Sequence, residues 1–291
     1  MTPQSKARLV IAEQISSSYA SHSDVKTVFA FGSVGSGLAD DYSDLELGVI
    51  WNHPPESETL KSIAANAGGE NWTYEGFHEP KLSYCDGYTK DGLEVEFAHW
   101  TSSIIDGIID DVMIRHDVSK NMLMYERQAT AATLMHCIPL SGHDYLKSLR
   151  SRVANYPRPL AIKMIEENLI VRPLDEFHMM AGRGEIPLFQ EHMCGRIRSM
   201  HTLVFALNSL YHPSFKWTRF FLREARIIPA NFEARVDSLF DSNLKNVVDD
   251  YGKLVTELFD LISIHFPEVD ISEATRIFNE PALKWSVRKA D

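Results

Sequence analysis

The sequence has few cysteines, and the three that it has, Cys85, Cys137 and Cys194, lie far apart. An odd and scattered set argues against a disulfide framework and favours a reduced compartment. No stretch approaches the roughly 20 consecutive apolar residues that a membrane-spanning helix needs. The first residues also lack the apolar run of a signal peptide. We therefore expect a cytoplasmic protein without a membrane segment.

Several chemical motifs are missing as well. The pattern Gly-x4-Gly-Lys-Ser/Thr does not occur, which disfavours a P-loop fold. The chain has 12 histidines, but none stands at a zinc-ligand spacing from a cysteine or another histidine. The stretch around Ser36 reads Ser-Val-Gly-Ser-Gly-Leu and lacks the first glycine of a hydrolase nucleophile elbow. These absences exclude three common kinds of catalytic site.

The sequence also has fewer basic than acidic residues. Forty acidic residues stand against 29 basic ones, which gives a formal charge of −11. Nonspecific nucleic-acid binding depends on lysine and arginine, so we do not expect it here. A negative field would suit a cationic small molecule, or it simply keeps the protein in solution. With 44% hydrophobic and 24% charged residues among 291, the composition is that of a globular protein with a real core.

The pattern of hydrophobic residues predicts an α+β fold in two parts. The first part, residues 1–118, mixes strand and helix signals, and the second, residues 119–291, is dominated by helical periodicity broken by prolines. In the first part we predict helices at 5–20, 57–66 and 103–113, and strands at 27–31, 44–51, 72–77, 81–88 and 93–100. In the second part we predict helices at 120–136, 144–155, 160–171, 188–211, 231–240 and 246–264.

The candidate site begins where the first predicted strand ends. Gly32 and Ser33 follow the apolar run Phe29-Ala30-Phe31. A triphosphate must lie close to backbone amides, and Gly32 permits that approach, while Ser33 supplies a hydroxyl and an amide. We therefore take Gly32 and Ser33 as candidate phosphate-binding residues.

Two carboxylates follow ten residues later. Asp44 and Glu46 stand two apart on a predicted strand, so their side chains leave the same face of the sheet. Adjacent carboxylates repel each other unless a cation lies between them. Mg2+ prefers hard oxygen ligands and shares itself between carboxylates and substrate phosphates. The pair therefore predicts a magnesium site.

A third carboxylate is expected from another strand. Glu94 and Glu96 alternate with apolar residues in the run Leu93-Glu94-Val95-Glu96-Phe97. We favour Glu96, because it stands further along the predicted strand and so reaches closer to the edge of the sheet where the site is expected, although either residue fits. It would be a third metal ligand, or a general base if one ion rather than two is bound. A solvated edge strand would show the same alternation.

Together these residues resemble the polymerase-β-type nucleotidyltransferase superfamily, whose pattern is Gly-Ser after a strand and then Asp-x-Asp or Asp-x-Glu. The form Ser43-Asp44-Leu45-Glu46 is similar to that of antibiotic nucleotidyltransferases of the kanamycin and lincosamide type. The helical stretch 205–217 resembles that of uncharacterised two-domain members. The resemblance implies Mg2+, ATP or another nucleoside triphosphate, and a hydroxyl acceptor held between a catalytic and a helical domain. It also implies that Asp44, Glu46 and Glu96 are the catalytic and metal-binding residues.

Basic side chains in the helical part are candidates for binding the triphosphate. Lys216 lies between Phe215 and Trp217 and could bind it, or could be a surface lysine with its stem on these rings. Arg196 and Arg198 could serve in the same way, although surface helix charges are common. The acceptor, the nucleotide base and the oligomeric state stay open. A protein side chain as acceptor, or a silent nucleotide-binding module of the same fold, are the alternatives to a small-molecule enzyme.

Overall fold

The computed structural model describes residues 1–120, 125–214, 216–241 and 243–282. It divides into two compact units, Met1–Tyr156 and Pro157–Asp291. The first unit carries a mixed sheet and the second is helical. This confirms the predicted α+β class. Within the described residues, no helix is both long and apolar enough to cross a membrane.

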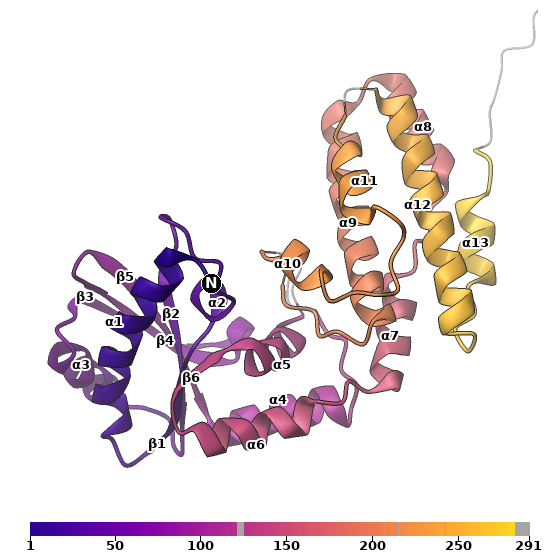
Figure 1. The fold of residues 1–291 in the computed structure, drawn as a ribbon. Helices are drawn as coiled ribbons and strands as arrows, with labels where there is room; N and C mark the ends of the chain where they lie inside the picture. The colour runs from indigo at the N-terminus through magenta and orange to yellow at the C-terminus, as the bar shows by residue number, and fades with distance from the viewer. Residues whose placement is uncertain (121–124, 215, 242, 283–291) are drawn as a thin grey trace, which may run out of the picture. The chain divides into compact units, whose positions relative to one another are not determined.

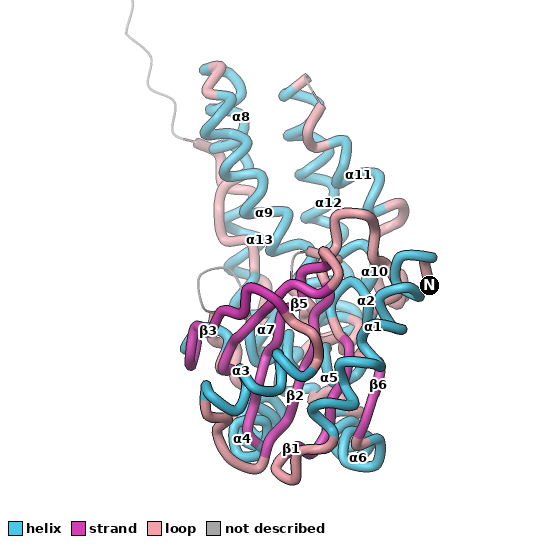
Figure 2. The backbone as a smooth tube through the Cα atoms, turned by 90° about the vertical axis from the view of Figure 1, so that its left-hand side faces the viewer, coloured by secondary structure: helices cyan, strands magenta, loops and turns pink. Residues whose placement is uncertain are grey.

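The first unit is built on a six-stranded sheet in the order β3-β4-β5-β2-β1-β6 (Figure 2). Strands β2 and β5 are parallel to each other, and every other neighbouring pair is antiparallel. The parallel pair lies in the middle of the sheet, and the hairpin of β3 and β4 forms one edge. The strands are β1 (Val25–Ala30), β2 (Leu45–Trp51), β3 (Glu70–His78), β4 (Ser83–Lys90), β5 (Leu93–Thr101) and β6 (Ile138–Ser141).

Helices cover the sheet. On one side α1 and α3 bury apolar residues of β2 and β5, including Leu47 and Phe97, in a common core with Ile15 and Leu60. Helices α4, α5 and α6 lie on the other side (Figure 1). The helical elements of this unit are α1 (Pro3–Ala20), α2 (Gly32–Gly35), α3 (Ser57–Asn66), the 3-10 turn η1 (Glu79–Lys81), α4 (Ser102–Met113), α5 (Glu126–His136) and α6 (His143–Val153).

The buried face of the sheet also holds a chain of polar side chains from four strands. Trp51 of β2 donates its indole N–H to Nδ1 of His99 on β5 at 3.0 Å. Nε2 of His99 lies 2.8 Å from Asp86 of β4, and both side chains are fully buried. Trp72 of β3 donates to the other oxygen of Asp86 at 2.7 Å. Since Nδ1 accepts, His99 is the Nε2–H tautomer and donates to Asp86. We call these four residues the buried polar chain.

The first unit extends well beyond residue 118, where the sequence analysis placed the domain boundary. Residues 138–141 form β6, which pairs with β1 through Phe29 and Pro139. The segment is short and contains a proline, so it shows little strand periodicity. The predicted helix at 120–136 begins at Glu126 in the structure, and residues 121–124 lie outside the described residues.

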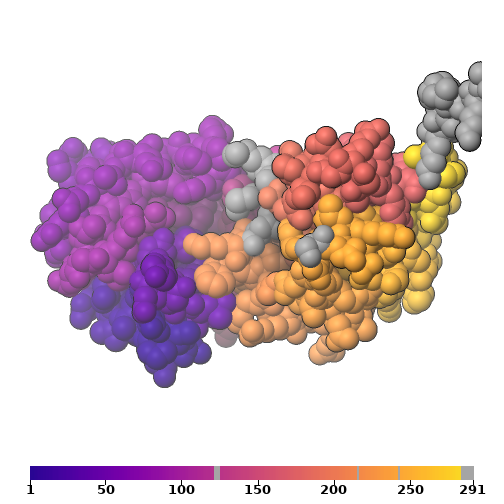
Figure 3. Space-filling view, turned by 90° about the horizontal axis from the view of Figure 1, so that it is seen from above, coloured from indigo at the N-terminus to yellow at the C-terminus, as the bar shows by residue number. Residues whose placement is uncertain are grey.

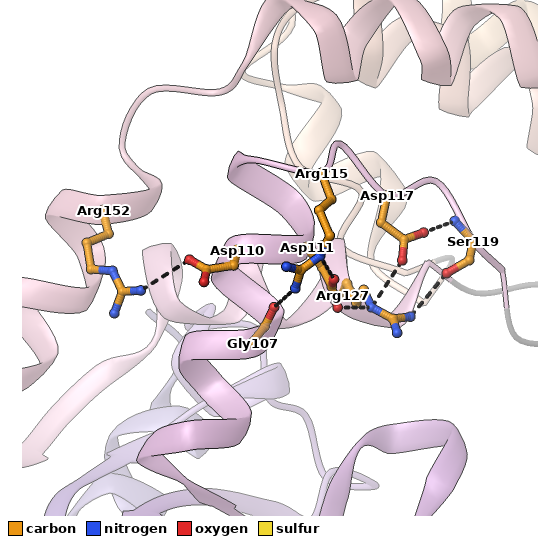
Figure 4. Close-up of polar contacts among 8 residues, drawn as sticks. All are labelled: Gly107, Asp110, Asp111, Arg115, Asp117, Ser119, Arg127 and Arg152. Carbon is orange, nitrogen blue, oxygen red and sulfur yellow. Dashed lines mark hydrogen bonds and ion pairs between the residues drawn. The ribbon is translucent and has the colours of Figure 1, made fainter.

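Ion pairs tie α5 to α4 in the first unit (Figure 4). Arg127 of α5 contacts Asp111 of α4 at 2.7 Å and Asp117, in the connecting segment, at 3.3 Å. Arg115 also pairs with Asp111. These contacts hold the end of α4 and the start of α5 together, which is a second reason why the unit continues past residue 118.

The second unit is a helical bundle. Its core includes aromatic contacts between Phe177 of α8, Phe189 of α9 and Tyr251 of α12. The helical periodicity of the sequence did not predict α8, α10 or α13. The helices are α7 (Arg158–Asn168), α8 (Leu174–Arg183), α9 (Ile186–Leu207), α10 (Thr218–Leu222), α11 (Phe232–Ser238), α12 (Leu244–His265) and α13 (Ser272–Phe278).

Candidate active site

Gly32 stands at the bend between β1 and the short α2. Its φ is +59°, in the left-handed region that glycine adopts without steric cost. A Cβ built on Gly32 would lie 1.5 Å from Oε2 of Glu46. The carboxylate of Glu46 therefore occupies the space that a side chain at position 32 would need. Glycine is required here both by the backbone angle and by the neighbouring acid.

Ser33 is a buried polar residue next to that bend. Its side chain is 2% exposed, and in the described part of the chain its hydroxyl has no hydrogen-bond partner. Buried hydroxyls nearly always make a hydrogen bond, because leaving one unpaired costs about 1–3 kcal/mol. A buried hydroxyl without a partner is the kind of group that a bound polar ligand satisfies.

Glu46 and Glu96 lie side by side in the centre of the sheet. They are register partners on the parallel strands β2 and β5. Neighbouring strands are about 4.8 Å apart, and partners on parallel strands point to the same face. The opposite face carries the core pair Leu47 and Phe97. Glu94, the other candidate, stands two residues before Glu96 on the same face of β5 and precedes the first register pair of β5 with β2, Val95 with Leu45.

Asp44 immediately precedes β2, which begins at Leu45. Its charge acts on Glu96: the pKa of Glu96 is raised, first by partial burial of its carboxyl and then by the negative charge of Asp44. Lys81 opposes this rise, and Glu94 and Glu75 add to it. The pKa shift shows that Asp44 and Glu96 lie within electrostatic range of each other. Two strand acids, Glu46 and Glu96, and Asp44 at the start of β2 thus share one part of the sheet surface.

This arrangement is not a complete protein-only metal cage. Among the residues that the structure describes, no group of three or more His, Cys, Asp or Glu side chains is placed so that it could hold a metal ion. Mg2+ commonly uses one or two carboxylates and takes its other ligands from water and substrate phosphates. The paired carboxylates of Glu46 and Glu96 fit that donor set.

The other predicted ligands belong to the second unit. Lys216 is exposed and lies between α9 and α10, and Phe215 lies outside the described residues. Arg196 and Arg198 are partly buried on α9, and the charge of Arg196 acts on the buried hydroxyl of Tyr251. Their predicted roles in triphosphate binding stay predictions.

The sequence analysis missed one group that shapes the site. Arg8 of α1 donates to the carbonyl oxygen of Ser43, the residue before Asp44, through Nε at 3.0 Å and Nη2 at 2.6 Å. No sequence motif signals this contact, because it joins a helix and a loop whose partners are 35 positions apart in the sequence. In the same loop, Asp40 accepts hydrogen bonds from the amide of Tyr42 and the hydroxyl of Ser43.

Comparisons with known proteins give limited information. A family model described as a domain of unknown function, DUF4037, matches residues 123–218, which excludes Gly32, Ser33 and the carboxylates. A comparison with curated proteins finds no match. Among solved structures, the chain is similar to a nucleotidyltransferase-like protein from Exiguobacterium sibiricum 255-15. The identity is 13%, the TM-score is 0.38, and the match covers 90% of this chain and 80% of that chain. The functional argument therefore rests on the geometry of the site.

Proposed function

We propose that this protein is a Mg2+-dependent nucleotidyltransferase that moves a nucleoside monophosphate, AMP from ATP, to a hydroxyl group of a small molecule. The observation that carries the proposal is the pairing of Glu46 with Glu96 on adjacent parallel strands, beside the Gly32–Ser33 bend. The acids supply hard oxygen ligands, and the orphaned Ser33 hydroxyl supplies a donor for a phosphate oxygen.

The chemistry needs a bond to form between the acceptor oxygen and the α-phosphorus while the bond from that phosphorus to the bridging oxygen breaks. Pyrophosphate leaves, and the proton of the acceptor hydroxyl must go to a base. Bound Mg2+ would neutralise the phosphate charge that develops in this displacement. In this proposal Glu46 and Glu96 would hold the ion together with phosphate oxygens, Asp44 would join them when the triphosphate is bound, and Ser33 would orient the triphosphate. If only one ion binds, Glu96 is free to take the proton, for which its raised pKa suits it.

The electrostatics around the site favour a positively charged acceptor. Glu75 and Glu94 lie close enough to Glu96 to raise its pKa, so negative charge extends beyond the three proposed ligands. The whole chain carries a formal charge of −11. Such a field attracts cationic molecules and raises their local concentration. An amine-bearing compound of the aminoglycoside kind would fit these conditions.

The decisive experiment is transfer of labelled AMP from ATP by the wild-type protein and its carboxylate variants. We expect Asp44→Ala and Glu46→Ala to reduce transfer by at least about a hundredfold, because metal-held charge stabilisation is worth several kcal/mol. The control Glu13→Gln removes an exposed acid from α1 and should transfer at the wild-type rate. Full activity in both alanine variants would contradict the metal assignment.

Thermal shift gives a second readout that does not need the acceptor. ATP with Mg2+ should raise the melting temperature of the wild type by binding to the folded state, and ATP alone should do so much less. Equal shifts with and without Mg2+, together with no turnover, would indicate a silent nucleotide-binding module instead. Label that appears on a protein in a lysate would indicate a protein side chain as acceptor.

A further inference from the structure

The start of α1 is hydrogen-bonded to the loop that joins the Gly32–Ser33 bend to Asp44. The hydroxyl of Thr2 donates to the carbonyl of Ala39 at 2.6 Å, and the amide of Ala39 donates to the hydroxyl of Ser5 at 3.0 Å. The amide of Thr2 donates to the carbonyl of Gly37 at 3.0 Å. Ser5 and Ala39 are fully or almost fully buried. The space-filling view shows the N-terminal segment in contact with the segment that follows β1 (Figure 3).

Arg8 extends this contact to the residue before the first acid. Its guanidinium places two donors on the single carbonyl oxygen of Ser43 and a third on the carbonyl of Gln4 at 3.3 Å. The side chain of Gln4 in turn donates to Asp41 at 3.0 Å. The loop is therefore held at residues 37, 39, 41 and 43 by the first turns of α1. We call Thr2, Gln4, Ser5 and Arg8 the helix latch.

The loop has a reason to need such a restraint. Asp44 stands immediately before β2, two residues from Glu46, whose register partner is Glu96, so repulsion between like charges acts to move Asp44 away from the sheet. Asp44 also lies outside β2, and the backbone ladder that fixes Glu46 does not begin until Leu45. The turn from Asp40 to Ser43 orders the loop locally but does not attach it to the rest of the unit.

We propose that the helix latch positions Asp44 for metal binding, with Arg8 as its principal positioning residue. The role of Asp44 rests on the proposed function, whereas the attachment of the loop does not. Arg8 acts through the carbonyl of Ser43 and touches neither metal nor substrate. A lysine at this position can present one donor to that carbonyl, but it cannot reproduce the guanidinium geometry.

Hydrogen exchange measured on the whole chain tests the attachment without any assumption about activity. In Arg8→Met, the amides of residues 38–43 should exchange at least roughly tenfold faster than in the wild type. In the wild type the loop can open only by breaking the guanidinium hydrogen bonds, and the variant has none to break. Amides of β2 should keep their protection. Lys6→Met removes an exposed positive charge from the same helix and should leave the loop unchanged. Equal exchange in wild type and Arg8→Met would overturn the proposal.

Kinetics then separate positioning from general destabilisation. We expect Arg8→Met to lower kcat by roughly ten- to a hundredfold, since small misplacements of a reacting geometry have effects of this size. The Mg2+ concentration for half-maximal rate should rise, while KM for the acceptor stays near the wild-type value. Arg8→Lys should recover part of kcat. A uniform loss that follows the melting temperature, with no change in Mg2+ dependence, would contradict a positioning role.

A wild-type protein without transfer activity would contradict the proposed function, and the kinetic comparison of the Arg8 variants could then not be made. The exchange experiment would still decide whether Arg8 holds the loop. An active wild type with an equally active Arg8→Met variant would contradict the latch and leave the proposed function standing.

Discussion

The two faces of strands β2 and β5 carry different kinds of side-chain pairs. On one face, Leu47 and Phe97 are register partners and are buried in the core beneath α1 and α3. On the other, one residue earlier in each strand, Glu46 and Glu96 form a pair of like charges. At these positions the comparison teaches that alternation along a strand places core packing on one face and the paired acids on the other, because successive side chains point to opposite faces. Substitutions one residue apart should therefore have opposite consequences.

The largest expected change in the free energy of unfolding comes from a substitution on the core face. Phe97→Ala should lower the free energy of unfolding by about 3–5 kcal/mol, because it leaves a cavity where a buried ring stood. Its neighbour Glu96→Gln should leave stability unchanged or raise it by roughly 0.2–1 kcal/mol, since it removes a like charge opposite Glu46. Denaturant unfolding of both variants measures this. Similar losses in the two would show that the faces are not separate.

A smaller change in the free energy of unfolding should come from the buried polar chain. Trp72→Phe removes the indole that donates to the buried carboxylate of Asp86, and it should lower the free energy of unfolding by about 1–3 kcal/mol. Tyr74→Phe is the matched control, since Tyr74 stacks on Trp72 but does not belong to the buried polar chain. If both variants unfold at the same denaturant concentration, the hydrogen bond to Asp86 contributes little.

The smallest effect on stability, but a large one on activity, is expected at Gly32. Gly32→Ala should cost about 1–2 kcal/mol for a left-handed backbone angle, and its Cβ should displace the Glu46 carboxylate. Gly76→Ala has a similar φ of +74° but open space around the new Cβ. Both variants should lose similar stability, and only Gly32→Ala should lose AMP transfer. Equal transfer in the two would show that the contact between Gly32 and Glu46 has no part in activity.

Local patterns predicted most of the first unit. The helix at 57–66 has the predicted bounds, and the strand predicted at 44–51 begins one residue later, at Leu45. Alternating or continuous apolar residues give such elements a clear period. Short elements were missed: β6 contains a proline, and its four residues depend on β1 for their hydrogen bonds. Because β6 was missed, the sequence-based boundary at 118 differs from the division after Tyr156.

The candidate site was predictable only in part for a similar reason. The bend at Gly32 and the spacing to Asp44 and Glu46 are local, so they can be recognised without a structure. The choice between Glu94 and Glu96 could not be made on firm grounds, because it depends on the register between two strands far apart in sequence. Arg8 gave no signal at all, since its partner is a backbone carbonyl.

By itself, then, the sequence determined the class of fold, the alternation of the strands and which glycine, serine and acidic residues stand at the ends of the strands. Those properties follow from the nearest neighbours of each residue, through steric preference and hydrophobic period. Tertiary structure alone decided that Glu46 lies beside Glu96, that its carboxylate fills the space above Gly32, and that α1 holds the loop before Asp44. Such contacts join distant parts of the chain, and their geometry is fixed by the packing of the whole unit.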